Sequence, residues 1–150
     1  MFDLQDLYQD IVMDHNRRPR NFGVLNDATF TADGFNPLCG DQITLYLKVE
    51  DNIVTDIAFD GVGCAISKSS ASMMTDSVKG MTLEKVDGVF NAFRGMITRR
   101  PGDDYDSEIL GELEILQGVS QYPTRIKCAT LSWHTLHAAL AQSGDTITTE

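Results

Sequence analysis

The fold class is decided by one stretch of the sequence, Gln42-Ile43-Thr44-Leu45-Tyr46-Leu47-Lys48-Val49-Glu50-Asp51-Asn52-Ile53-Val54-Thr55-Asp56-Ile57-Ala58-Phe59-Asp60. Apolar and polar residues alternate from Gln42 to Glu50, which is the pattern of a strand with one buried face. Asp51-Asn52 is a turn signal, and residues 53–60 are predicted to be the hairpin partner of that strand. We therefore expect a small antiparallel sheet in the N-terminal half of the chain.

Helical periodicity surrounds this hairpin on both sides. Apolar residues recur at steps of three and four, followed by residues that stop or cap a helix. Pro19 ends the first helix, because a proline disfavours helix at the residue before it. Gly80 ends the second, and Thr82 caps the third. The predicted helices span residues 2–15, 65–79, 83–97, 113–119 (ending before Pro123) and 129–144.

The remaining segments are predicted to be irregular. Residues 20–35 are expected to form a loop that holds one short strand over 28–32, and residues 98–107 an exposed excursion. The Thr-rich C-terminal end is expected to fray. A length of 150 residues is that of one domain. The sequence thus predicts a single α+β domain over residues 1–150, with helices packed on one face of the small sheet.

Composition excludes several classes of function. Lys and Arg number 12 against 22 Asp and Glu, for a net charge of −10, which argues against a nucleic acid as partner. The apolar runs are too short to span a bilayer, so no membrane partner is expected. The start, Met1-Phe2-Asp3-Leu4, has neither the basic nor the apolar region of a secretory signal. We expect a cytoplasmic protein.

The three cysteines lie at the boundaries of predicted elements. Cys39 precedes the first strong strand, and Cys64 and Cys128 precede predicted helices, where the helix dipole stabilises a thiolate. Cys39 and Asp41 are two residues apart in an extended segment, so their side chains can point the same way. Gly40, Gly61 and Gly63 let the backbone approach a compact site closely.

This residue set leaves two interpretations open. Three thiolates and one carboxylate are the right number of ligands for tetrahedral zinc, or for part of an iron–sulfur cluster. The gaps between the cysteines match no short zinc-finger pattern, so three separate buried thiols remain the alternative.

Three motifs around the cysteines resemble those of a known family. The chain is similar to the IscU/SufU family of iron–sulfur assembly proteins from about residue 3 to residue 140. This resemblance implies an α+β fold with a three-stranded antiparallel sheet and a metal site made by Cys39, Asp41, Cys64 and Cys128. The motifs are Asn36-Pro37-Leu38-Cys39-Gly40-Asp41, Gly61-Val62-Gly63-Cys64-Ala65-Ile66-Ser67 and Arg125-Ile126-Lys127-Cys128-Ala129-Thr130-Leu131-Ser132-Trp133.

Three departures from the IscU scaffolds make the chain resemble the SufU branch. Lys127 stands where the scaffolds have histidine, Gln121-Tyr122-Pro123-Thr124-Arg125 replaces their chaperone-docking motif, and the segment Arg99–Ile109 is additional. The resemblance implies a zinc-dependent sulfurtransferase that accepts sulfur on Cys39 from a cysteine desulfurase of the SufS type, a pyridoxal-phosphate enzyme. A downstream iron–sulfur assembly scaffold would then be the second partner.

Two other functions stay open at this stage. The protein could be a scaffold on which a [2Fe–2S] cluster forms before delivery, or a structural zinc module without chemistry. Lys127 in place of histidine favours sulfur transfer over the scaffold.

Four further residues have less specific interpretations. Arg125, three residues before Cys128, is predicted at the mouth of the site and in contact with a partner. His15 is expected to cap the C-terminal end of the first helix. His134 and His137 share a helix face, and packing is a more common role for such a pair than metal binding.

Overall fold

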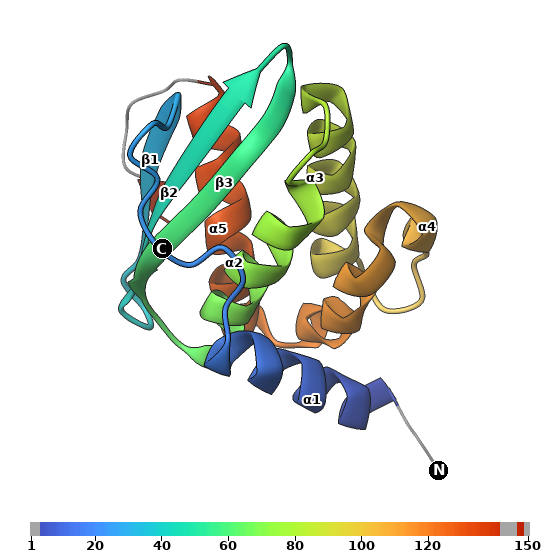
Figure 1. Ribbon diagram of the computed structural model, residues 1–150. Helices are drawn as coiled ribbons and strands as arrows, with labels where there is room; N and C mark the ends of the chain where they lie inside the picture. The colour runs from blue at the N-terminus through green and yellow to red at the C-terminus, as the bar shows by residue number, and fades with distance from the viewer. Residues whose placement is uncertain (1–3, 142–146, 149–150) are drawn as a thin grey trace.

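The computed structural model describes residues 4–141 and 147–148 (Figure 1). The elements follow one another along the chain as α1 (Leu4–Arg17), β1 (Phe30–Asn36), β2 (Asp41–Glu50), β3 (Ile53–Val62), α2 (Ala65–Val78), α3 (Leu83–Thr98), α4 (Ser107–Leu110), the 3₁₀ helix η1 (Gly111–Gln121), α5 (Pro123–Ala141) and β4 (Ile147–Thr148).

The sheet has the strand order β3-β2-β1-β4. β1, β2 and β3 pair antiparallel through two hairpins, which confirms the three-stranded antiparallel sheet expected from the sequence. The two-residue β4 adds a short parallel pairing to the outer edge of β1, within the C-terminal segment that was expected to fray. Asn36 and Asp41 face each other at the end of the first hairpin, and this register places both residues at one end of the sheet.

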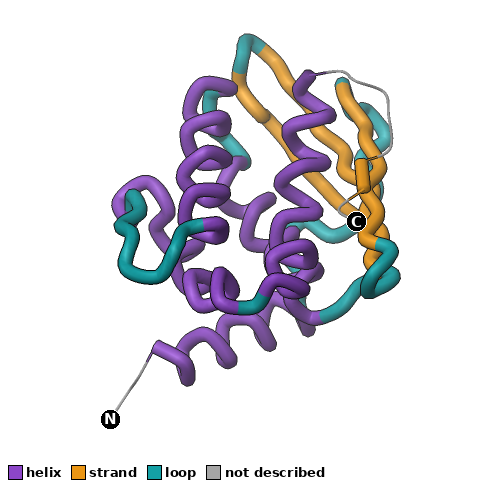
Figure 2. The backbone as a smooth tube through the Cα atoms, turned by 180° about the vertical axis from the view of Figure 1, so that it is seen from behind, coloured by secondary structure: helices purple, strands orange, loops and turns teal. Residues whose placement is uncertain are grey.

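The long helices lie on one face of the sheet, as both views of the backbone show (Figures 1 and 2). The inward side chains of β2 and β3 pack against α2 and α5, and α3 packs against α5 and η1. Burial of apolar side chains between these layers supplies most of the stabilising free energy. The most enclosed large side chains are Trp133, Phe93, Leu45, Leu47, Ile57, Met74, Met96, Ile97, Leu113, Leu116, Leu131 and Leu136.

The strand β1 differs from its prediction, because it spans residues 30–36 where a loop with a short strand over 28–32 was expected. Its sequence alternates weakly, and Gly34 interrupts it. The structure explains this glycine: a Cβ at Gly34 would lie 2.1 Å from Thr135 Oγ1 of α5. Glycine in a strand marks a close backbone approach, and here it lets α5 pack directly on β1.

The last helix also differs from its prediction. It begins at Pro123 and not at residue 129, so Pro123 opens α5 where the sequence analysis used it as a stop. A proline is well tolerated at the first helical position, because its missing N–H would have no helical partner there. The predicted end at Gly144 lies outside the described residues.

Buried serines of α2 hold this helix against its neighbours. Ser69 Oγ donates to the Val12 carbonyl of α1 over 2.6 Å, and Ser70 Oγ donates to the Ala129 carbonyl of α5 over the same distance. Trp133 Nε1 donates in turn to Ser70 Oγ. These bonds fix α2 relative to α1 and α5. They thereby also fix Cys64, the N-cap of α2, relative to Cys128 in α5. Of the described helices, none combines the length and the apolar character needed to cross a membrane.

Candidate metal centre

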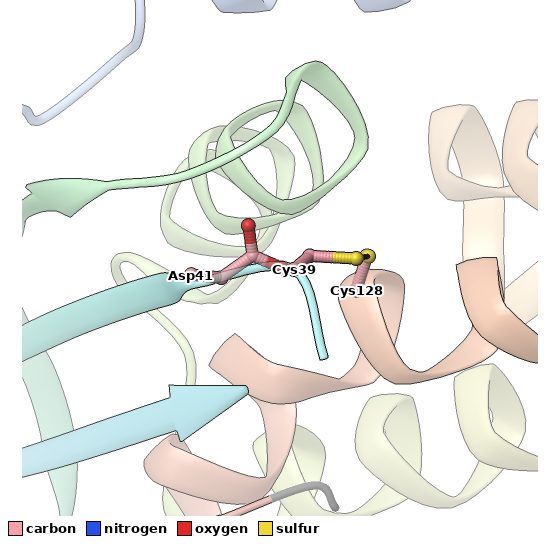
Figure 3. A group of neighbouring side chains, drawn as sticks. All are labelled: Cys39, Asp41 and Cys128. Carbon is pink, nitrogen blue, oxygen red and sulfur yellow. Dashed lines mark hydrogen bonds between the residues drawn. The ribbon is translucent and has the colours of Figure 1, made fainter. Parts of the chain in front are cut away.

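Three segments that are distant in the sequence converge at one end of the sheet. Cys39 lies in the turn between β1 and β2, Asp41 opens β2, Cys64 caps α2, and Cys128 lies in α5. Figure 3 shows Cys39, Asp41 and Cys128 pointing toward one another at the junction of the β2 strand and α5. The structure therefore brings together residues that the sequence analysis joined by chemistry alone.

Cys39, Asp41 and Cys128 form the compact part of this cluster. One ligand atom of each lies within 4.8 Å of the other two, and the two sulfur atoms are 3.4 Å apart. Two thiolates on one tetrahedral zinc ion would lie about 3.8 Å apart, given Zn–S bonds of about 2.3 Å. The observed separation is close to that value, so a metal ion needs only a small adjustment here.

Asp41 is fully buried and is held by two donors. The Cys64 backbone N–H donates to Asp41 Oδ1 over 2.8 Å, and the Asn36 amide donates to Asp41 Oδ2 over 3.1 Å. A buried carboxylate is costly unless it is hydrogen-bonded or coordinates a metal. Asp41 is therefore a candidate oxygen ligand held in a fixed orientation.

Cys64 lies beside this compact group. Its Sγ is 4.0 Å from Asp41 Oδ2, so the Asp41 carboxylate is the part of the cluster that it contacts. As predicted, it sits at the N-terminus of a helix: its sulfur accepts the Ser67 backbone N–H at 3.4 Å. Gly63 next to it leaves room for Asp41, because a Cβ there would lie 3.0 Å from Asp41 Oδ1.

Cys128 differs from its prediction. It lies inside α5 and not at its N-terminus, and only 3% of its surface is exposed. Its Sγ approaches the Thr124 carbonyl at 3.6 Å, one helical turn earlier. Burial raises the pKa of the Cys128 thiol, and the neighbouring Cys39, Cys64 and Asp41 act in the same direction. A divalent cation that replaces the proton would remove this penalty, since metal binding releases thiol protons.

Asn36 is a site residue that sequence reasoning quoted in a motif without giving it a role. It is fully buried, and its Nδ2 contacts both Asp41 Oδ2 and, at 3.6 Å, Cys128 Sγ. The contact with Cys128 spans most of the chain, so local sequence gave no signal for it. A polar residue at the end of a strand, next to candidate ligands, was the available hint.

Arg125 lies on the exposed first turn of α5, with its guanidinium 4.6 Å from the centre of the Tyr122 ring. Both residues line an open cavity of about 370 Å³ between α1, η1 and α5, together with Tyr8 and Arg99. Burial raises the pKa of Tyr8. The charge of Arg125 lowers this pKa in part, and Cys64 raises it further. Arg125 takes part in no ion pair among the described residues.

The histidines lie apart from the compact cluster. His15 is buried, with Nδ1 2.7 Å from Ser72 Oγ and Nε2 3.2 Å from Glu112 Oε1. It therefore connects α1 to both α2 and η1. The predicted role as a helix cap is wrong. His134 and His137 pack on the Phe90 ring, which confirms their expected role in packing.

The donor set fits zinc. Three cysteine sulfur atoms and one carboxylate form the kind of soft and anionic shell that zinc prefers, with Asp41 and Cys128 buried and Cys39 exposed. Zinc would be held by Cys39, Asp41 and Cys128, with Cys64 completing four ligands after a small approach. The same residues could bind iron, so the donor set alone does not separate zinc from a cluster.

The chain is similar to known proteins along most of its length. Residues 7–142 match the family model of the NifU-like N terminal domain. The zinc-dependent sulfurtransferase SufU of Bacillus subtilis is 48% identical over 93% of each chain. The iron–sulfur cluster assembly scaffold protein IscU of Thermotoga maritima is 38% identical over 89% of this chain and 92% of its own. A crystal structure from Fervidobacterium islandicum, named as a candidate scaffold protein of the SUF system, superposes with a TM-score of 0.83 at 31% identity, covering 91% of this chain and 98% of that one.

Proposed function

This chain belongs to the family of NifU-like N-terminal domains, alongside SufU and IscU proteins, and from that premise we propose that it is a zinc-dependent sulfurtransferase. It accepts persulfide sulfur from a cysteine desulfurase of the SufS type in the cytoplasm, for iron–sulfur cluster assembly. One observation carries this proposal: an exposed cysteine, Cys39, touches a buried ligand set that consists of Asp41 and Cys128.

Zinc bound to Cys39, Asp41, Cys64 and Cys128 would keep the thiols deprotonated at neutral pH, where a free thiol is mostly protonated. A thiolate is the form that attacks a persulfide. Four protein ligands close a zinc site, so sulfur transfer requires that one ligand leaves.

Cys39 is the ligand best placed to leave. It is exposed and lies in a four-residue turn in which Gly40 has a φ of +72°, whereas Cys128 is buried in a helix and Cys64 is fixed as a helix cap. The vacated position would be filled by a side chain of the desulfurase. A histidine is suited to this, because imidazole is a good zinc ligand.

The transfer step balances without an external oxidant or reductant. The Cys39 thiolate attacks the outer sulfur of the desulfurase persulfide, and the sulfur–sulfur bond of that persulfide breaks. The desulfurase cysteine leaves as a thiolate, and Cys39 carries the new persulfide together with its proton. The sulfur then passes to a downstream assembly scaffold.

Arg125 is proposed to contact the desulfurase. Arg125 is exposed on α5 three residues before Cys128 and has no carboxylate partner among the described residues, in a chain whose net charge is −10. An acidic group on the partner surface would complement it.

The second candidate function is a scaffold that assembles a [2Fe–2S] cluster. It is favoured by the relatives named as IscU scaffolds and by a ligand set that iron also accepts. Metal content and the visible spectrum of protein purified without air separate the two. One zinc ion per chain and no visible absorption support sulfur transfer, whereas a brown protein that contains iron supports the scaffold.

The substitution Cys39→Ser tests the proposal directly. Serine keeps the shape of the side chain but loses the soft ligand and the nucleophile. The variant should abolish stimulation of the desulfurase and retain the fold and part of the zinc. The measurement mixes protein, desulfurase and free cysteine, and locates the added sulfur by mass spectrometry. Full stimulation by the variant, or persulfide mainly on Cys64 or Cys128, would overturn the role of Cys39.

A metal-stripped control addresses the mechanism as a whole. Wild-type protein freed of zinc should lose stimulation and regain it when zinc is restored. Equal stimulation with and without zinc would contradict a metal-held thiolate as the acceptor.

A further inference from the structure

We propose that Asn36 is a positioning residue of the metal site, whose side-chain amide orients Asp41 and Cys128 as ligands and strengthens metal binding. This inference rests on the proposed function, because it takes these two residues to be zinc ligands. It concerns a residue that makes no bond to the metal and acts only through two of its ligands.

The position of Asn36 is fixed by the backbone. It is the last residue of β1 and pairs directly with Asp41, the first residue of β2. Its surface is fully buried, with the β1–β2 turn on one side and α5 on the other. The hairpin register therefore sets where the amide points, without any help from a metal ion.

Both contacts of the amide go to candidate ligands. Asn36 Nδ2 lies 3.1 Å from Asp41 Oδ2 and 3.6 Å from Cys128 Sγ. An amide nitrogen carries two hydrogen atoms, so one can be directed to each neighbour. Hydrogen bonds to anionic acceptors are the strong ones, and the partners of a metal ligand hold it in its coordinating orientation.

The other end of the same amide has no partner. Asn36 Oδ1 is a buried atom without a hydrogen bond among the described residues. Burying an unpaired carbonyl opposes folding, which offsets part of what the two N–H contacts contribute to the stability of the metal-free protein. Rotating it by half a turn would place the oxygen against a carboxylate and a sulfur, which is electrostatically worse. The nitrogen therefore faces the ligands, and its two N–H groups are what the residue contributes.

A merely structural role predicts a different outcome from a positioning role. If Asn36 only packs the hairpin, its loss should lower the melting temperature of the metal-free protein and leave zinc affinity unchanged. If it positions ligands, the zinc affinity of the folded protein should fall and the geometry of the bound metal should change, whether or not the metal-free protein loses stability.

The test uses Asn36→Leu, which keeps the size of the side chain and removes both the donors and the unpaired oxygen. Zinc affinity is measured by competition with a chromophoric chelator, and the thiolate-to-metal band of the Co²⁺-loaded protein reports ligand geometry. We expect the dissociation constant for zinc to rise about 10- to 100-fold. The Co²⁺ band should shift, because Asp41 and Cys128 are no longer held in the same orientation.

The matched control is Ser132→Ala, which removes the other buried polar atom without a partner among the described residues. Ser132 makes no hydrogen bond to a ligand, so its removal should leave zinc affinity and the Co²⁺ band unchanged. If Asn36→Leu fails to fold, Asn36→Ala takes its place in the same measurements.

The outcomes separate this inference from the proposed function. Wild-type protein that binds no zinc overturns both. Wild-type protein that binds one zinc ion, with unchanged affinity and an unchanged Co²⁺ band in the Asn36 variant, overturns the role of Asn36 alone.

Discussion

The four proposed zinc ligands differ in how firmly the surrounding protein holds each side chain. This difference determines which ligand can leave the metal. Asp41 receives two hydrogen bonds and is fully buried, and Cys64 accepts the N–H of Ser67. Cys39 has one sulfur contact, with Cys128, and faces solvent. A site of this kind holds its metal through the buried ligands while one exposed ligand exchanges.

Replacing Asp41 with alanine should weaken zinc binding and change sulfur transfer. A carboxylate is a harder and less tightly held zinc ligand than a thiolate, so it adds lability to a sulfur-rich shell. Its loss leaves a three-cysteine site open to water, and we expect zinc affinity to fall at least about tenfold. Chelator competition and desulfurase stimulation measure the two effects.

The control for this substitution is Asp33→Ala. Asp33 is an exposed carboxylate on β1 that accepts a hydrogen bond from Thr44, away from the ligands. Zinc affinity should stay the same in this variant. If Asp41→Ala matches it in both affinity and activity, Asp41 does not belong to the site.

At the scale of elements, strong local patterns predicted the structure and weak ones did not. Alternation over residues 42–60 gave the β2–β3 hairpin, and the small residues after Gly63 gave α2 with Cys64 at its start. The second half of β1 was missed, because Gly34 breaks its pattern, and that glycine is explained only by α5 packing on it. The start of α5 was missed because a proline can either open or follow a helix.

The packing of α5 on α3 makes stability depend on pH. His134 lies against Phe90, and burial lowers its pKa, with Arg94 and His137 acting in the same direction. The unfolded chain takes up a proton near pH 6.5, and the folded protein does so only at lower pH. The free energy of unfolding should therefore fall as the pH drops below about 6.5, and stay constant with respect to this group at higher pH.

The substitution His134→Gln should reduce this dependence. The measurement is urea unfolding of metal-free protein at pH 7.5 and pH 5.5, because zinc ligands also titrate when metal is present. The wild-type protein should lose more stability between the two pH values than the variant. An equal loss in both would show that His134 does not contribute.

At the scale of the whole molecule, the sequence predicted which residues form the candidate site but not how these residues lie relative to one another. Spacing along the chain gave no reason to join Cys39 to Cys128. Ligand chemistry left a shared site open as one alternative, and the family resemblance implied it. The structure joins them because the β1–β2 turn and α5 meet at one end of the sheet. The contacts of Asn36 with Asp41 and Cys128 depend on the same meeting, so no local pattern predicts them.

Because the ligands come from the β1–β2 turn, the start of α2 and the interior of α5, bound zinc should stabilise the whole fold. At a free zinc concentration of about 1,000 times the dissociation constant, binding adds about 4 kcal/mol. For a chain of 150 residues, that corresponds to a rise in melting temperature of roughly 8–16 °C. The serine bonds between α2 and α5 need no metal, so the stripped protein should remain folded.

The measurement compares melting temperatures of zinc-loaded and chelator-stripped protein, and Cys64→Ser and Cys128→Ser serve as variants with damaged sites. Each variant should melt near the stripped wild type and respond weakly to added zinc, because one anchored ligand is missing. Hydrogen exchange of the stripped protein should increase in the β1–β2 turn and the first turn of α2, and change little in α3, which holds no ligand. Loaded and stripped wild type melting together would mean that these four residues do not jointly hold a metal, because a ligand that binds only the folded state must shift the unfolding equilibrium.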